Sequence, residues 1–164
     1  MTRPRLLTLM VLGLVCFVVS ALGEAASRRL HVTSQVVQGT FTGDPDNPQL
    51  GDRSIGNSDV FDERGVRVGT AVAVCTIISV PPLATRDECR LTAEFAEGQI
   101  IYGGVAPTWA LVRAVEVGSE LQWGILGGTG EFRTARGEVM SVVVAAGSGV
   151  SPGVIDTTFD LDLD

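Results

Sequence analysis

Residues 127–139 have the sequence GGTGEFRTARGEV, a glycine cluster followed by a β-rich run that continues to Ala146. Glycine tolerates positive φ and close approach of other backbone, so Gly127, Gly128 and Gly130 predict a tight corner. The residues beyond the corner predict a strand, because successive side chains of a strand point to opposite faces. One face of this strand carries Arg136, Glu138 and Met140, and the other carries Gly137, Val139 and Ser141.

Two further runs define faces in the same way. Residues 155–164 alternate strictly, with apolar or threonine side chains on one face and aspartate or threonine on the other. A one-residue slip would bury the aspartates, so the register is well specified. Residues 66–79 form the longest β-run, and both of its faces are apolar. One face carries Val66, Val68, Val72, Val74 and Ile78, and the other, inner face carries Gly69, Ala71, Ala73, Cys75 and Ile77. We expect this strand to be covered on both sides, which in a barrel means the lumen inside and another subunit or layer outside.

The remaining runs complete an all-β pattern with no sustained helical period. About eight short strands with glycine turns fit one antiparallel sandwich or barrel, and a barrel removes exposed strand edges by closing. The small residues Gly69, Ala71 and Ala73 on one face suit a tapered interior. Further strands are expected over 30–38, 58–62, 90–97, 99–102, 111–117 and 121–126, with 111–117 paired to 121–126 and a loop over 39–57.

The N-terminal residues 1–27 resemble a secretory signal peptide. A short cationic segment precedes the apolar run 6–22, and small residues that suit cleavage follow it. The alternative is an uncleaved membrane anchor, although the run is short for a membrane span. We therefore predict a secreted, extracellular protein with one domain over 28–164 and no stable membrane insertion after cleavage.

The amino-acid composition limits the classes of molecule that the protein can bind. The net charge is −7 and the chain has no lysine, which argues against nucleic acid and anionic membrane as partners. His31 is the only histidine, and its place near a new N-terminus favours a surface residue over a catalytic base. No other residues have the spacing of metal ligands, so we expect no metal site.

Two cysteines remain after residue 27, and an even number in an exported protein favours a disulfide. Cys75 and Cys89 flank Pro81-Pro82, as a bridge across the base of a long hairpin requires. Closing a loop of this length contributes roughly 3 kcal/mol in the chain-entropy model. The alternative is that Cys75 is a free, reactive thiol.

Seven short motifs follow one another along the chain: LGD (50–52), VFD (60–62), GVRVG (65–69), VCTII (74–78), FAEGQIIYGG (95–104), ILGGTGEF (125–132) and ARGEV (135–139). In this order, over roughly residues 30–163, they resemble the superfamily of allene oxide cyclases and dirigent proteins. The resemblance implies an eight-stranded antiparallel β-barrel with a hydrophobic lumen, commonly a homotrimer. It also implies binding of a hydrophobic small molecule, phenolic or oxylipin-like, with no cofactor.

Individual residues match the family unevenly. The resemblance places Glu131 and Arg136 where acidic and arginine residues are implicated in the dirigent branch, with Asp52 as a further catalytic candidate. The alternative for Glu131 and Arg136 is a salt bridge that pins the corner. The ligand-binding candidates are Tyr102, Phe95 and Trp123.

The cyclase branch fits less well. Its first-strand glutamate has no counterpart here, because that strand offers only Gln35, Gln38 and His31. Cys75 matches the cysteine position of the cyclases, but it cannot serve as it does there if it is bridged to Cys89.

Two functions follow from these observations. The first is a secreted barrel that binds a hydrophobic small molecule and steers its cyclisation or coupling. The second is a non-enzymatic extracellular structural or interaction module, which the missing glutamate and the expected disulfide favour. A hydrolase ranks third, since Ser141 and Ser148 lack a nucleophile elbow and His31 has no evident acid partner.

Overall fold

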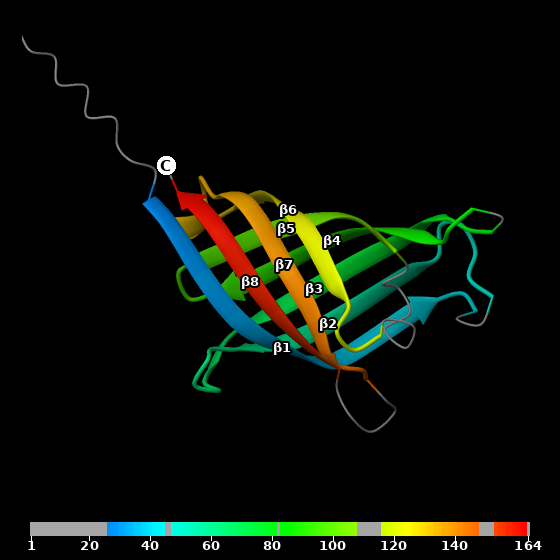
Figure 1. Cartoon of the computed structure of the whole chain (residues 1–164), viewed down its shortest axis with the longest axis horizontal. Helices are drawn as coiled ribbons and strands as arrows, with labels where there is room; N and C mark the ends of the chain where they lie inside the picture. Colours follow the sequence, from blue (N-terminus) through cyan, green and yellow to red (C-terminus); the bar gives the residue numbers. More distant parts are fainter. Residues whose placement is uncertain (1–25, 45–46, 82, 108–115, 148–152, 164) are drawn as a thin grey trace, which may run out of the picture.

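The computed structural model describes residues 26–44, 47–81, 83–107, 116–147 and 153–163. These residues form eight antiparallel strands that pair in chain order and close into a barrel, as predicted, with β8 returning to β1 (Figure 1). The strands are β1 (Ala26–Thr42), β2 (Arg53–Phe61), β3 (Arg67–Ser79), β4 (Arg86–Phe95), β5 (Gly98–Pro107), β6 (Glu120–Gly128), β7 (Arg136–Ala145) and β8 (Val154–Leu163), with the 3-10 helix η1 (Gly130–Phe132) between β6 and β7.

The facing of the strands follows the predicted alternation. In β8 the buried residues Thr157, Phe159 and Leu161 alternate with less buried neighbours, and β7 buries Val139, Ser141 and Val143 in the same manner. The apolar residues on the outer face of β3, which we expected another subunit or layer to cover, are exposed in the single chain. They include Val72, Val74 and Ile78.

The faces predicted for the start of this run were wrong at one position. Val68 was assigned to the outer face, but it packs against the core. The cause is a register shift between β2 and β3, where Val60 pairs with Gly69 but the next residue, Phe61, pairs with Arg67. Such a bulge leaves one residue unpaired and changes the direction in which it points.

The loop predicted over 39–57 was too long. Thr40 pairs with Ile55 and Thr42 with Arg53, so β1 and β2 both extend into this segment. Glycine, serine and asparagine are weak strand formers, which hid the extension in the sequence. Backbone pairing with neighbouring strands outweighs that preference, since β2 is also hydrogen-bonded to β3 along its length.

The pairing predicted for 121–126 is contradicted over part of its length. Residues 124–128 of β6 pair with β5, and residues 120–124 pair with β7. Residues 111–115 lie outside the described residues, and Val117 stands in a turn. The two apolar runs are close in sequence, which favours a hairpin, but closure of the barrel places β5 beside β6.

The glycine corner is confirmed and closes one end of the barrel. Gly130 has φ +60°, and a Cβ on it would collide with the carbonyl oxygen of Glu97. The corner is hydrogen-bonded to the β4–β5 turn, because the backbone nitrogen of Thr129 donates to the Gln99 oxygen at 2.9 Å and that of Glu131 to the Glu97 oxygen at 2.9 Å. This geometry directs the ring of Phe132, which is 1% exposed, into the core.

The predicted disulfide is present between β3 and β4. Cys75 and Cys89 are directly paired in the ladder, their Cα atoms are 4.0 Å apart, and both side chains are buried. The free-thiol alternative for Cys75 is thereby excluded.

The proposed signal peptide falls almost entirely in residues 1–25, which lie outside the described residues, while Ala26 and Ser27 begin β1. Within the described part of the chain, none of the helices is long and apolar enough to cross a membrane.

Candidate functional site

Aromatic rings meet inside the barrel near the glycine corner. The ring of Phe159 on β8 lies 5.2 Å from that of Tyr102 on β5 and 6.4 Å from that of Phe95 on β4, both edge-on. Phe95 in turn lies 5.9 Å from Phe132. Because β8 is neighbour to neither β4 nor β5, these contacts cross the interior. Two of the predicted ligand-binding residues, Phe95 and Tyr102, are thus brought together in a packed aromatic cluster.

The opposite wall of the interior is lined by small side chains. On β2 and β3 the inward face includes the buried Val60 and Cys75, and Gly56, Ala71 and Ala73 share that face by strand parity and pairing. These three residues are only half-buried although they point inward. A Cβ added at Gly56 would meet no heavy atom within 4 Å, so space remains beside β2 at this position.

A buried polar network lies on the inward faces of β6, β7 and β8. The indole nitrogen of Trp123 donates to the hydroxyl oxygen of Ser141 at 3.3 Å, and that oxygen lies 3.3 Å from the Thr157 hydroxyl. All three side chains are at most 3% exposed. Trp123, the third predicted ligand-binding residue, is thus inside the barrel, but it is held by hydroxyl groups rather than by the aromatic cluster.

Burial controls the ionisation of Tyr102. Desolvation raises the pKa of its phenol well above the ordinary value near 10, so the side chain stays neutral at physiological pH. A neutral phenol can donate a hydrogen bond to a ligand oxygen or accept one from a ligand hydroxyl.

The sequence prediction missed one charged residue inside the barrel. Asp87 on β4 is 0% exposed and alternates with the buried residues Cys89, Leu91 and Ala93, so it belongs to the inward face. Residues 86–88, Arg-Asp-Glu, have the composition of a solvated turn, which concealed it. The signal that could have found Asp87 is parity, because it stands two positions before a cysteine predicted to be bridged.

The predicted catalytic residues lie elsewhere. Glu131 on η1 is exposed and pairs with Arg28 at 3.8 Å, and Arg136 is exposed and donates to the backbone oxygen of Ala135 at 2.8 Å. The salt bridge weighed between Glu131 and Arg136 is therefore not formed. Asp52 lies in the turn before β2, where its carboxylate accepts a hydrogen bond from the Gln49 backbone nitrogen at 2.8 Å. The structure does not bring these three residues together, and their catalytic role stays a prediction.

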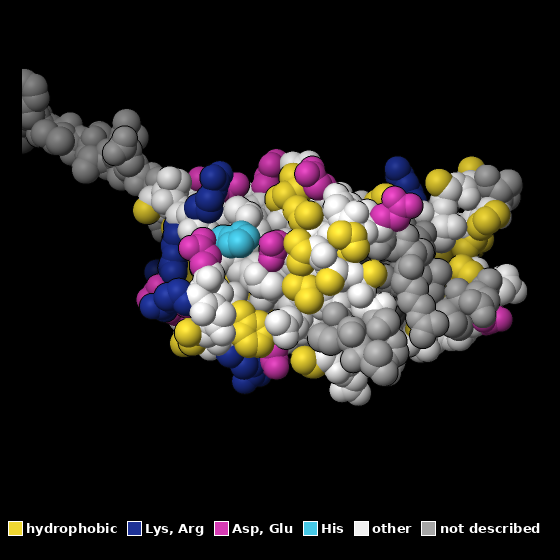
Figure 2. All heavy atoms as spheres, turned by 60° about the horizontal axis from the view of Figure 1, so that its bottom comes forward, with side chains coloured by type: hydrophobic (Ala, Val, Ile, Leu, Met, Phe, Trp, Pro, Cys, Tyr) yellow, Lys and Arg dark blue, Asp and Glu magenta, His cyan; other side chains and the backbone are white. Residues whose placement is uncertain are grey.

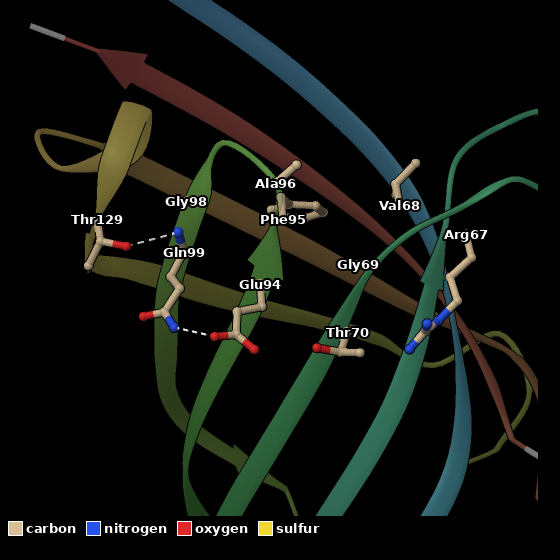
Figure 3. Close-up of a pocket in the computed structure, with 10 residues that line it drawn as sticks. All are labelled: Arg67, Val68, Gly69, Thr70, Glu94, Phe95, Ala96, Gly98, Gln99 and Thr129. Carbon is tan, nitrogen blue, oxygen red and sulfur yellow. Dashed lines mark hydrogen bonds between the residues drawn. The ribbon is translucent and has the colours of Figure 1, made fainter.

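A shallow groove on the surface lies where β4 ends and where β3 and β5 begin (Figure 3). Its polar lining includes Glu94, whose carboxylate accepts a hydrogen bond from the Gln99 side chain at 2.5 Å. Gln99 is also tied to the corner, since its backbone nitrogen donates to the Thr129 hydroxyl at 3.1 Å. The groove is an unsuitable site for an apolar ligand, because exposed polar groups line it.

His31 lies at the surface on β1. Its Nδ1 is 3.6 Å from a carboxylate oxygen of Glu63, and both side chains are substantially exposed. Among the described residues, no three histidine, cysteine, aspartate or glutamate side chains are grouped so that they could hold a metal ion.

The fold is that of a known family. The family model described as "Allene oxide cyclase barrel like domain" matches residues 30–149, and the chain belongs to this family. This confirms the resemblance noted in the sequence. The chain matches no curated protein sequence.

Solved structures with the same fold have different activities. One is a pyocyanin demethylase, with a TM-score of 0.61 and 21% identity over 84% of this chain and 100% of that one. A second is AbnU, an exo-specific intermolecular Diels-Alderase, with a TM-score of 0.64 and 14% identity over 83% and 98%. A third is a pterocarpan synthase dirigent protein, with a TM-score of 0.64 and 16% identity over 85% and 97%. At these identities the likeness establishes the fold alone.

Proposed function

We propose that this chain binds an apolar small molecule, phenolic or oxylipin-like, inside its barrel and steers the cyclisation or coupling of that molecule without a cofactor. The observation that carries the proposal is the half-buried small side chains that face inward beside β2 and β3, opposite buried aromatic and hydroxyl groups. A shaped apolar space restricts the conformations of a flexible reactant, and a few polar groups stabilise charge that develops in it.

Family membership supports the same function. Structures of this fold include an exo-specific intermolecular Diels-Alderase and a pterocarpan synthase dirigent protein. In this chain the ligand would contact Tyr102, Phe95 and Trp123, of which Tyr102 and Trp123 are nearly fully buried and carry the polar hydrogens. Glu131 and Arg136 at the glycine corner, and Asp52 in the turn before β2, remain candidates for catalysis.

Native mass spectrometry of the protein secreted by its own producing cells tests this function. We expect a reproducible apolar adduct of constant mass, lost when the protein is denatured. Protein that carries no adduct and shows no affinity for any phenolic or oxylipin-like compound would contradict the proposal. The same sample tests the proposed secretion, because a cleaved signal peptide shortens the chain by about the 27 residues predicted from its composition.

We also propose a homotrimer. Large apolar side chains are exposed on the outer faces of neighbouring strands: Ile55 on β2 is 40% exposed, Val74 on β3 37%, Val105 on β5 52% and Leu126 on β6 62%. A groove between them is lined by Val74, Val105 and Leu126, and also by the charged residues Arg53, Glu88 and Arg90. Burying such a patch against another copy removes apolar area from water. A sedimentation mass of one subunit would contradict this assembly.

The second candidate is a non-enzymatic extracellular interaction module. Exposed apolar side chains on the outer surface favour it, and Figure 2 shows hydrophobic side chains gathered on one face beside the charged end that carries His31. Turnover that is lost in Glu131→Gln or Arg136→Ala would exclude this candidate.

A further inference from the structure

We propose that Ser34 on β1 and Ser58 on β2 bind the same carbonyl oxygen of an otherwise apolar ligand, such as a ketone or an enone. This inference rests on the proposed function, because it assumes that the ligand enters the barrel. It adds the two side chains that hold the ligand in the interior and the functional group that they select. The sequence prediction missed both residues.

The two serines point into the barrel from adjacent strands. Ser34 is paired directly with Val60, which is 1% exposed in the core, and Ser58 lies two positions before Val60 on the same face of β2. The register between β1 and β2 is continuous here, and its shift comes only beyond Val36. Such diagonal neighbours are about 7–8 Å apart, and hydroxyl hydrogen bonds are about 2.7–2.8 Å long. One oxygen atom placed between the two side chains can therefore bond to both.

The fold itself uses neither hydroxyl. Ser34 is 9% exposed, so it is more than nine-tenths buried, and Ser58 is half-buried. Within the described parts of the chain, no hydrogen bond joins either hydroxyl to a side chain or to the backbone. The oxygen of Ser34 is nevertheless not fully enclosed by protein atoms. Alanine or valine would avoid the cost of burying a hydroxyl without a partner, so packing alone does not account for this serine.

Space for a ligand adjoins both serines. A Cβ added at Gly56, the inward residue two positions from Ser58, would meet no heavy atom within 4 Å. Ala71 pairs with Ser58, points inward and is only half-buried. Ile155 pairs with Ser34 and is half-buried as well. The inward residues that keep some exposure therefore form one continuous patch around the two hydroxyls.

The surroundings define the functional group of the ligand. Each serine carries one hydrogen that none of the described residues accepts, so two donors face the same space. A carbonyl oxygen has two lone pairs and no hydrogen of its own, so it satisfies both donors at once. The neighbouring inward residues are glycine, alanine, valine and isoleucine, which offer no partner to a charged group. The site therefore favours a neutral carbonyl on an apolar body, and its two hydrogen bonds would withdraw electron density from a conjugated enone.

The experiment compares 2-acetylnaphthalene with 2-ethylnaphthalene, which have the same ring and nearly the same shape but differ in the carbonyl. In the full-length protein, Ser34→Ala and Ser58→Ala should each weaken binding of the ketone about 3- to 10-fold, the ratio that one net hydrogen bond supplies. The double variant should lose more affinity than either single variant. All three variants should bind 2-ethylnaphthalene as the parent protein does, because alanine keeps the wall apolar.

Two further measurements separate hydrogen bonding from packing. The infrared C=O stretch of the bound ketone should lie at lower frequency in the parent protein than in the double variant. Ser34→Ala should not lower the free energy of unfolding, because its hydroxyl has no partner in the described structure to lose. Thr70→Val, on the outward face of β3 beside Ala71, is the matched control and should bind the ketone as the parent protein does.

The possible outcomes distinguish the donor site from the binding barrel. The same ketone affinity and C=O frequency in the double variant and the parent protein would overturn the donor site while leaving the binding barrel intact. An equal loss of affinity for both compounds would also overturn it, because that result would show an effect of packing. A clear loss of stability in Ser34→Ala would assign that hydroxyl to the fold instead. Binding of neither compound would contradict the donor site and the proposed function together.

Discussion

Around Phe159 the interior is packed ring against ring, whereas beside β2 and β3 it is lined by glycine and alanine. The ring contacts run across the barrel from β8 to β4 and β5, below a corner whose Phe132 is almost fully buried. The small residues on β2 and β3 point into the same interior but keep residual exposure. The difference indicates that one side of the interior stabilises the barrel and the other leaves room for a ligand.

The largest effect is expected at the packed side. Phe132→Ala removes a ring that is 1% exposed and leaves a cavity among Phe95 and its neighbours. We expect a loss of about 3–5 kcal/mol in the free energy of unfolding, measured in denaturant. Phe41→Ala, which removes a half-buried ring from β1, is the matched control and should cost clearly less. Equal losses of unfolding free energy in the two variants would show that the aromatic cluster stabilises the barrel no more than a half-buried ring does.

Removing the disulfide is the next largest change. Cys75 and Cys89 are 14 residues apart, and the chain-entropy model gives about 3 kcal/mol for a loop of that size. The double variant Cys75→Ala/Cys89→Ala should unfold at correspondingly lower denaturant, and a reducing agent should no longer affect it. A midpoint identical to that of the oxidised parent protein would argue against a stabilising bridge.

A pH titration tests the packed side of the interior at a single residue, Tyr102. Tyr102 is the only tyrosine, and burial raises the pKa of its phenol above the ordinary value near 10. The neutral phenol therefore contributes fully to the free energy of unfolding below about pH 10. Above that pH the tyrosine of the unfolded chain ionises and that of the folded chain does not, so the free energy of unfolding falls by about 1.4 kcal/mol per pH unit.

The absorbance of tyrosinate measures this directly. It should appear together with unfolding rather than before it, and Tyr102→Phe should remove the corresponding part of the pH dependence. Ionisation near pH 10 in protein that stays folded would mean that the phenol is not buried.

The smallest effects are expected at the rim. Glu131→Gln and Arg136→Ala alter exposed side chains, and a surface ion pair such as Arg28–Glu131 contributes about 0–1 kcal/mol. Neither variant should change the affinity for 2-ethylnaphthalene by more than about twofold, since an exposed polar contact contributes little to apolar binding. A large loss of affinity in either one would place the ligand at the rim rather than in the interior. Unchanged affinity with lost turnover would assign both residues to catalysis.

Periodicity predicted the parts of this fold that depend on one strand. The two faces of β7 and β8 follow from alternation, because a one-residue slip would bury charge. The glycine corner follows from backbone constraints, and Gly130 does adopt positive φ. The bridge between Cys75 and Cys89 follows from their position in a hairpin.

Properties that depend on two strands could not be predicted. The extension of β1 and β2 comes from pairing between weak strand formers, and the place of β6 comes from closure of the barrel. Alternation put Ser141 and Thr157 on inward faces, but their contact depends on the β7–β8 register, in which they are paired directly. Asp87 could have been found from its parity with Cys89, but the polar composition of residues 86–88 concealed it.

The most direct test of the account is to fill the interior beside β2 and β3. Ala73 points inward, while its neighbour Val72 is 40% exposed on the outer face of the same strand. We expect Ala73→Phe to weaken binding of 2-ethylnaphthalene more than about 10-fold, since the new ring would occupy the space for the ligand. Val72→Phe should bind it as the parent protein does, and circular dichroism should show both variants folded. Undiminished binding by folded Ala73→Phe would contradict the claim that the ligand site lies inside the barrel.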